Sequence, residues 1–176
     1  MYAGFTGRTS SRILKSVDGG KNWIDMDGGF EDMWRRQARI KNIAVSPHNL
    51  NIIYAVLSER LYKSTDGGTS WNELKMSPNQ KTGRNIWHRD ILLTNDPNII
   101  YLTTAESGLY RSTNGGKSWN KTHRNEADRI RINFITIDPK NHKIIYAGDN
   151  ARLYKSTNSG RTWQTILNRP LKFEER

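Results

Sequence analysis

One short motif, Ser-x-Asp/Asn-x-Gly-x-x-Trp, carries residues that could do chemistry, and it occurs four times. The copies lie in 15–23, 63–71, 111–119 and 155–163. A glycine-rich turn with a hydroxyl and a carboxylate could cradle a phosphate or hold a cation. A catalytic loop, however, has no reason to recur at nearly even spacing. Because self-similarity at a period of about 20–50 residues is typical of propellers and solenoids, we interpret the motif as a structural turn.

The residue types of the motif suit a turn and an anchor. The Asp or Asn oxygen can accept hydrogen bonds from backbone amides of the turn, and the second glycine can adopt positive φ at little steric cost. The tryptophan can fill the space between two sheets, burying roughly 150–250 Å². Asn in two copies keeps the acceptor oxygen without the charge, which argues against a calcium site. The residues in these roles are Ser16, Asp18, Gly20, Trp23, Ser64, Asp66, Gly68, Trp71, Ser112, Asn114, Gly116, Trp119, Ser156, Asn158, Gly160 and Trp163.

Composition limits the classes of function. The 176 residues carry a formal charge of +11, which favours acidic partners. The chain has no cysteine, so disulfides and thiolate metal sites are excluded. The four histidines show no metal-ligand spacing, and we expect neither a metal nor a cofactor. No apolar run approaches the ~20 residues of a membrane span, and no secretory signal is visible at the start.

Each repeat predicts four short strands. In the second repeat, apolar alternation and short apolar runs between turn residues predict strands at 40–47, 52–57, 61–64 and 69–74. The third and fourth repeats have the same plan, and the first has strands at 2–6, 12–16 and 21–26 but no inner strand before them. Four short strands at hairpin spacing in a unit of this length are typical of a propeller blade. The sequence therefore predicts an all-β propeller of about four four-stranded antiparallel blades, the first lacking its inner strand.

The expected blades cover approximately 1–28, 38–76, 87–124 and 129–168, followed by a tail at 169–176. Three explanations of the missing strand stay open. The tail could complete a four-bladed ring, two chains could join head to tail into an eight-bladed ring, or the chain could be part of a larger propeller. An unpaired edge strand invites pairing with another chain, and we favour the last two explanations over a four-bladed monomer.

The repeated motif resembles the Asp-box, or bacterial neuraminidase repeat. The wider pattern, for example "IIYAV" followed by "LYKSTDGG" and Trp, is similar to the propellers of xyloglucanases, sortilin-type receptors and photosystem II assembly factors. The resemblance implies a propeller whose Asp-box turns lie on the face away from the ligand site. It also implies an extracellular, lumenal or periplasmic location. Function does not follow from it, since the same turn occurs in enzymes, receptors and assembly factors.

Basic and aromatic residues gather in the connections that precede the inner strands. In a propeller these connections lie on the face that carries the central pocket. We hypothesise a basic, tryptophan-containing ring that binds an anionic ligand, with Arg donating paired hydrogen bonds and Trp offering a stacking surface. The alternative is that the tryptophans pack under loops and the arginines form a solvated face. The residues of the hypothetical ring are Trp34, Arg35, Arg36, Arg39, Trp87, His88, Arg89, Arg129 and Arg131.

Three classes of function are compatible with these features. A non-catalytic binding or assembly module, forming a homo-oligomer or part of a larger propeller, would bind an acidic protein or an anionic carbohydrate, and we favour it. A xyloglucanase- or sialidase-like glycoside hydrolase needs two facing carboxyl groups, for which Glu59, Glu106 and Asp149 are the weak candidates. The Arg-Ile-Pro signal of sialidases is absent. Nucleic-acid binding by charge alone is the third class, and no recognised nucleic-acid motif supports it.

Overall fold

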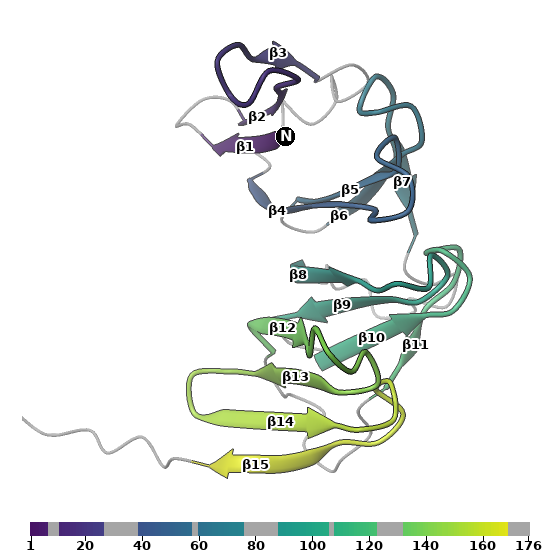
Figure 1. The fold of residues 1–176 in the computed structure, drawn as a ribbon. Helices are drawn as coiled ribbons and strands as arrows, with labels where there is room; N and C mark the ends of the chain where they lie inside the picture. The colour runs from purple at the N-terminus through teal and green to yellow at the C-terminus, as the bar shows by residue number, and fades with distance from the viewer. Residues whose placement is uncertain are drawn as a thin grey trace, which may run out of the picture.

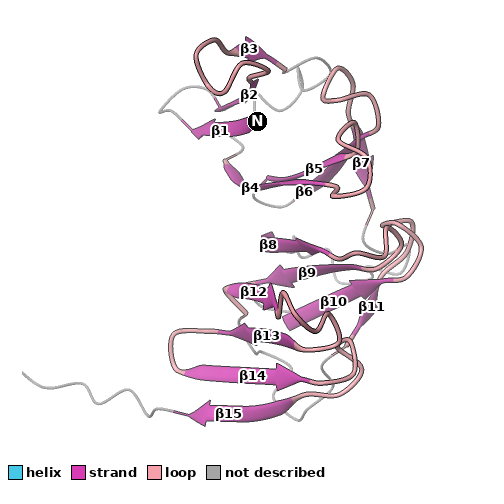
Figure 2. Ribbon diagram, in the orientation of Figure 1, coloured by secondary structure: helices cyan, strands magenta, loops and turns pink. Residues whose placement is uncertain are grey.

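The computed structural model describes residues 1–6, 11–26, 39–57, 60–75, 88–105, 108–122 and 132–168. These ranges contain fifteen β-strands and no helix (Figure 2). Accordingly, they hold no helix that could cross a membrane. The strands form four antiparallel sheets, which we call blades 1 to 4, and in each sheet every strand pairs with the next one along the chain.

The strand bounds are as follows. Blade 1 consists of β1 (Tyr2–Thr6), β2 (Ser11–Lys15) and β3 (Ile24–Asp25). Blade 2 consists of β4 (Ile40–Val45), β5 (Ile53–Leu57), β6 (Arg60–Ser64) and β7 (Asn72–Leu74). Blade 3 consists of β8 (His88–Leu93), β9 (Ile100–Thr104), β10 (Gly108–Ser112) and β11 (Asn120–Lys121). Blade 4 consists of β12 (Phe134–Ile137), β13 (Ile145–Gly148), β14 (Arg152–Ser156) and β15 (Gln164–Asn168).

The blades succeed one another along an open arc, with blade 1 and blade 4 at its two ends (Figure 1). The inner strands β4, β8 and β12 neighbour one another, and β1 lies against β4. The prediction of an all-β propeller whose first blade is one strand short is confirmed. The described parts of the four blades do not close into a ring, and the proposed tail strand at 169–176 lies outside the described residues.

In the two internal blades, the second strand is buried on both of its faces. Every residue of β5 and β9 is buried, because neighbouring blades cover the sheet from either side. A continuous apolar run in place of alternation is the sequence pattern of such a strand. Tyr54 and Trp119 share one apolar cluster although they belong to blades 2 and 3. The core of the molecule therefore lies between blades.

The outer strands begin later than expected. The outer strands of the first two repeats were predicted to start at 21 and 69, whereas β3, β7, β11 and β15 each begin directly after the motif tryptophan. In blade 2, the Ser70 amide donates to Asp66 Oδ1 at 2.9 Å. Because that amide serves the turn, it cannot pair with the third strand, and the residues before the tryptophan belong to the turn.

The expected positive φ is present at the second glycine of each turn, with φ of 92°, 96°, 89° and 73° at Gly20, Gly68, Gly116 and Gly160. The residue before each of them also has positive φ, which the sequence reasoning did not predict. Three of those residues are glycines, and the fourth is Ser159 with φ of 56°. A side chain is tolerated there in blade 4 in spite of the unfavourable backbone conformation.

The motif tryptophans fill the seams between blades, with one exception. Trp71 and Trp119 are 8% exposed, and the Trp71 indole donates to the Met26 carbonyl of blade 1 at 3.1 Å. Trp163 is half-buried against the cluster shared by blades 3 and 4. Trp23 is 39% exposed, since no described sheet precedes blade 1. The wedge role therefore holds where two blades meet.

We expect Trp119→Ala to lower the free energy of unfolding by about 3–5 kcal/mol, because it opens a cavity in the seam between blades 2 and 3. The matched variant Trp23→Ala removes the same side chain from a position that is 39% exposed, and it should cost at least about 1 kcal/mol less because no seam cavity is opened. Urea unfolding of dilute protein measures both. Equal losses in the two variants would contradict the wedge role.

Candidate functional site

Exposed basic side chains gather where the inner strands begin. Arg39 and Lys41 flank the first residue of β4, and Arg89 is the second residue of β8; all three are exposed. Lys41 and Arg89 are equivalent positions of consecutive repeats, on inner strands that neighbour each other. We call these three residues the basic rim. Arg39 and Arg89 belong to the predicted ring, and Lys41 lies beside them in sequence or repeat position.

A carboxylate below the basic rim joins three blades. Asp90 of β8 accepts hydrogen bonds from the Asn42 side chain of blade 2 and, at 3.2 Å, from the Ile135 amide of blade 4. Its own amide donates to Thr103 Oγ1 at 3.0 Å. The sequence reasoning missed Asp90. A usable signal existed, because Asn42 and Asp90 occupy the same place in consecutive repeats. This contact fixes the inner strands that carry the rim.

The remaining residues of the predicted ring divide into two groups. His88 is 3% exposed, so its side chain lies inside blade 3 and not on the exposed rim. The others fall outside the described residues, and their predicted role stays a prediction; they are Trp34, Arg35, Arg36, Trp87, Arg129 and Arg131. Of the predicted ring, Arg39 and Arg89 are therefore described and exposed, at the starts of the neighbouring strands β4 and β8.

One of the three candidate catalytic carboxylates is described. Asp149 lies in the turn between β13 and β14, where its Oδ1 accepts from the amides of Ala151 at 2.8 Å and Arg152 at 2.7 Å. Such contacts are those of an Asx turn. Glu59 and Glu106 lie outside the described residues, so the pairing that glycoside hydrolysis requires stays a prediction.

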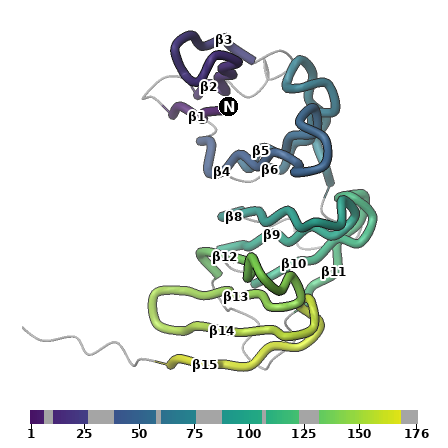
Figure 3. Tube along the Cα trace, in the orientation of Figure 1, coloured from purple at the N-terminus to yellow at the C-terminus, as the bar shows by residue number. Residues whose placement is uncertain are grey.

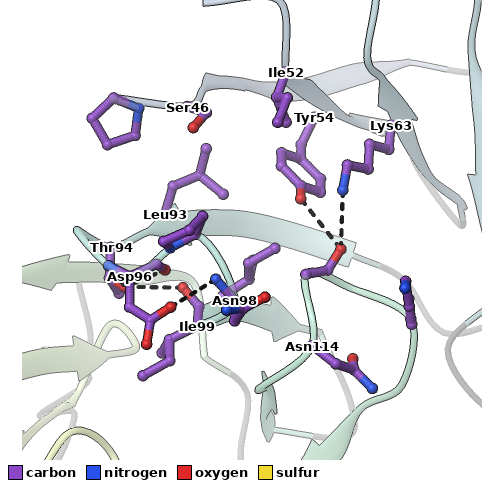
Figure 4. A pocket seen from close by; sticks show the side chains of 15 residues that line it. Ser46, Ile52, Tyr54, Lys63, Leu93, Thr94, Asp96, Asn98, Ile99 and Asn114 are labelled. Carbon is purple, nitrogen blue, oxygen red and sulfur yellow. Dashed lines mark hydrogen bonds between the residues drawn. The ribbon is translucent and has the colours of Figure 1, made fainter. Parts of the chain in front are cut away.

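The opposite ends of the inner strands border a pocket between blades 2 and 3. Its volume is about 240 Å³, and Ser46 and Thr94 lie among its lining residues (Figure 4). The Tyr54 hydroxyl and the Lys63 ammonium point at one oxygen, the Gly115 carbonyl, at 3.3 and 3.4 Å (Figure 4). Burial raises the pKa of Tyr54 to about 12 and lowers the pKa of Lys63. Tyr54 and Lys63 therefore form hydrogen bonds between blades 2 and 3, and we interpret the pocket as a consequence of blade packing.

The Ser and Asx side chains of the Asp-box turns form hydrogen bonds within their own turn. Asp66 Oδ1 accepts from the Ser64 hydroxyl and the Ser70 amide, and Oδ2 accepts from the Ser70 hydroxyl. Ser64 Oγ accepts from the Gly68 amide at 2.8 Å. The serine thus closes the turn itself. In blade 3, Asn114 keeps the pattern, accepting from the Ser118 amide at 2.8 Å. Within the described ranges, no group of three His, Asp or Glu could hold a metal ion.

These hydrogen bonds stabilise the ionised form of the aspartates. Contacts with Ser70 and Ser64 lower the pKa of Asp66 to about 2, and contacts with Asn22 and Ser16 lower the pKa of Asp18 to about 2. An aspartate of the unfolded chain titrates near 3.9. The turns therefore contribute stability that is fully present above about pH 4 and is lost as the pH falls through about 2.

We expect the double variant Asp18→Asn/Asp66→Asn to weaken this acid dependence. Asn occupies the same place in blades 3 and 4, with the same acceptor contacts, so the turn is preserved while the titrating group is removed. Between about pH 5 and pH 2, the free energy of unfolding of the variant should fall less than that of the wild type. Urea unfolding across this range is the measurement. Parallel curves would show that the two carboxylates do not contribute.

Comparison with known proteins agrees with this geometry. The family model of the BNR/Asp-box repeat matches residues 110–121. No curated protein sequence matches the chain. Among solved structures, the chain is similar to the GH74 xyloglucanase from Xanthomonas campestris, at 19% identity and a TM-score of 0.64, over 96% of this chain and 29% of that one.

Two further structures have the same fold. A GH74 enzyme from Niastella koreensis is 21% identical with a TM-score of 0.63, over 94% of this chain and 29% of the enzyme. YCF48 from Cyanidioschyzon merolae is 17% identical with a TM-score of 0.57, over 73% of this chain and 37% of YCF48. The chain thus spans well under half the length of these proteins. Residues 110–121 are a BNR/Asp-box repeat, and the chain has the blade architecture of a β-propeller.

Proposed function

We propose that the protein is a non-catalytic binding or assembly module whose basic rim binds an acidic segment of a partner protein. The observation that carries the proposal is the exposure of Arg39, Lys41 and Arg89 at the starts of adjacent inner strands. Asp90 anchors these strands to each other. A rim held on a rigid support loses little freedom when it binds, which favours affinity.

Charge and fold support this proposal. A formal charge of +11 attracts acidic partners and raises their association rate. One propeller of similar fold, YCF48, has been solved with a D1 peptide bound. Arginine matches a carboxylate with two parallel hydrogen bonds, which suits Asp- or Glu-rich segments. An anionic carbohydrate offers the same carboxylates on a stiffer backbone and is the alternative ligand.

The test compares two triple variants with equal changes in charge. Arg39→Ala/Lys41→Ala/Arg89→Ala removes the basic rim. Its control removes one exposed basic residue from each of three Asp-box turns and consists of Lys21→Ala, Lys117→Ala and Arg161→Ala. We expect the rim variant to bind fluorescent poly-L-glutamate at least about tenfold more weakly and with a shallower salt dependence. The control should stay within about threefold of the wild type.

The outcomes separate the possibilities. Equal losses in both variants would mean that the ligand responds to overall charge and not to the rim. Unchanged binding by the rim variant would overturn the proposal. A rim-dependent affinity for polygalacturonate that exceeds the affinity for poly-L-glutamate would assign the site to anionic carbohydrate.

A glycoside hydrolase is the second candidate, favoured by the similarity to GH74 enzymes. One observation argues against this candidate. Asp149, the described carboxylate among the three, accepts backbone hydrogen bonds that stabilise its own turn. We expect no release of reducing sugar from xyloglucan and no cleavage of aryl glycosides. Hydrolysis that disappears in Glu106→Gln would replace the binding module by an enzyme, since an amide cannot act as acid or nucleophile.

A further inference from the structure

A tyrosine and a basic residue form the same cross-strand pair in every blade. The pairs lie on the second and third strands of the repeat, at the same register position. In each pair the cation lies over the tyrosine ring, 5.3–6.0 Å from its centroid, as expected for a cation–π contact. The pairs are Tyr2 with Lys15, Tyr54 with Lys63, Tyr101 with Arg111, and Tyr146 with Lys155.

In the first three blades the pair reaches the Asp-box turn of the following blade. The Tyr2 hydroxyl and the Lys15 ammonium lie 3.1 and 3.4 Å from the Gly67 carbonyl oxygen. Tyr54 and Lys63 donate in the same way to the Gly115 carbonyl. These acceptors belong to the third residue after the motif serine. The contact is therefore a repeated lock between one blade and the next.

Blade 3 keeps the lock with one change. The Tyr101 hydroxyl donates to the Ser159 carbonyl of blade 4 at 2.6 Å. Arg111 Nε donates to the Tyr101 oxygen at 3.2 Å, so the cation acts through the tyrosine. The same interaction thus occurs in three consecutive seams. A tyrosine hydroxyl donates a hydrogen bond to a carbonyl of the next turn, and a Lys or Arg side chain lies beside the tyrosine.

Each end of the arc holds one unused half of this lock. In blade 4, the half-buried Tyr146 keeps its cation contact with Lys155, and no described residue offers it a carbonyl. In blade 1, the Gly19 carbonyl is the equivalent acceptor; Gly19 is exposed, and no described group donates to it. The Asp18 carboxylate beside Gly19 adds negative charge to the receiving turn, which complements Lys155.

Apolar side chains repeat the same asymmetry. In blades 1 and 2, Met26 and Leu74 follow the motif tryptophan by three residues and pack on the next turn at Gly68 and Gly116. Ile166 is the equivalent residue of blade 4 and is 44% exposed. On the receiving end, Trp23 is the exposed wedge. The donor end therefore carries an apolar residue without a described cover, and the acceptor end carries an indole that other blades bury.

We propose that blade 4 of one chain docks on blade 1 of a second copy, so that two chains close a ring of eight blades. The occupant is a second copy because the same chain carries both halves of the lock: Tyr146, Lys155 and Ile166 at one end, and Gly19 and Trp23 at the other. The two surfaces differ, so the contact is head to tail and not isologous, and such contacts form rings when the rotation closes. Blade 1 and blade 4 lie at the two ends of the arc (Figure 3). This assembly does not require the ligand proposed for the basic rim.

Sedimentation equilibrium from about 1 to about 100 µM tests the assembly. We expect a dimer of twice the 20.3 kDa chain mass. Tyr146→Phe/Lys155→Ala removes both donors and should raise the dimer dissociation constant at least about tenfold. The matched control, Tyr54→Phe/Lys63→Ala, removes the same groups from an internal seam. It should lower the urea midpoint of the chain and leave the dissociation constant within about threefold.

Crosslinking tests the orientation, since the chain has no cysteine of its own. Gln164 is exposed and pairs across the sheet with Lys155, so it lies on the docking face without belonging to the lock. Chains with Val17→Cys and chains with Gln164→Cys, each folded by circular dichroism, are mixed and treated with a short thiol crosslinker. We expect the mixed pair to crosslink and each variant alone to stay uncrosslinked. A monomer at all concentrations, an assembly larger than a dimer, or crosslinking of either variant with itself overturns the proposal.

Discussion

The structure depends on the covering of each blade by its neighbours. The second strands β5 and β9 are buried on both faces, so a single four-stranded sheet of this composition would expose apolar surface on two sides. Burying that surface is the main favourable contribution to folding. Seams between blades therefore replace a central core, and Trp71 and Trp119 fill them. At the two ends of the arc, no described blade covers the outer face of the sheet, and Trp23 and Ile166 are exposed there.

Hydrogen bonds across the seams fix the position of each blade relative to the next. Apolar contact alone would let neighbouring blades slide, whereas the hydroxyl of Tyr54 and the ammonium of Lys63 meet a single carbonyl in the next turn. That carbonyl is presented by the Asp-box turn, whose shape depends on the serine and Asx contacts and on two residues of positive φ. The motif is therefore a coupling element between blades as well as a turn within one. The polar groups of the motif thus stabilise the turn and the contact between blades. Such a structural role agrees with the occurrence of the motif in every repeat.

The proposed binding surface lies at the other end of the inner strands. β4 lies between Arg39 at the basic rim and Ser46 at the pocket between blades. Asp90 joins blades 2, 3 and 4 below the rim, and the turns join the same blades at the far end. A surface supported from both ends can vary its side chains without loss of fold. Similar propellers accordingly include GH74 enzymes and YCF48.

Local sequence by itself determined the strands and the turns. Apolar runs such as that of β5 and the Ser-x-Asp/Asn-x-Gly-x-x-Trp spacing act within a few residues, so they can be read without a partner. The starts of the outer strands were placed too early, because hydrogen bonds such as that from the Ser70 amide to Asp66 compete with strand pairing. Only the tertiary structure decided that Asp90 bridges three blades, that His88 is buried, and which of four equivalent tryptophans is exposed. These properties depend on which blade lies next to which, and identical motifs carry no information about their neighbours.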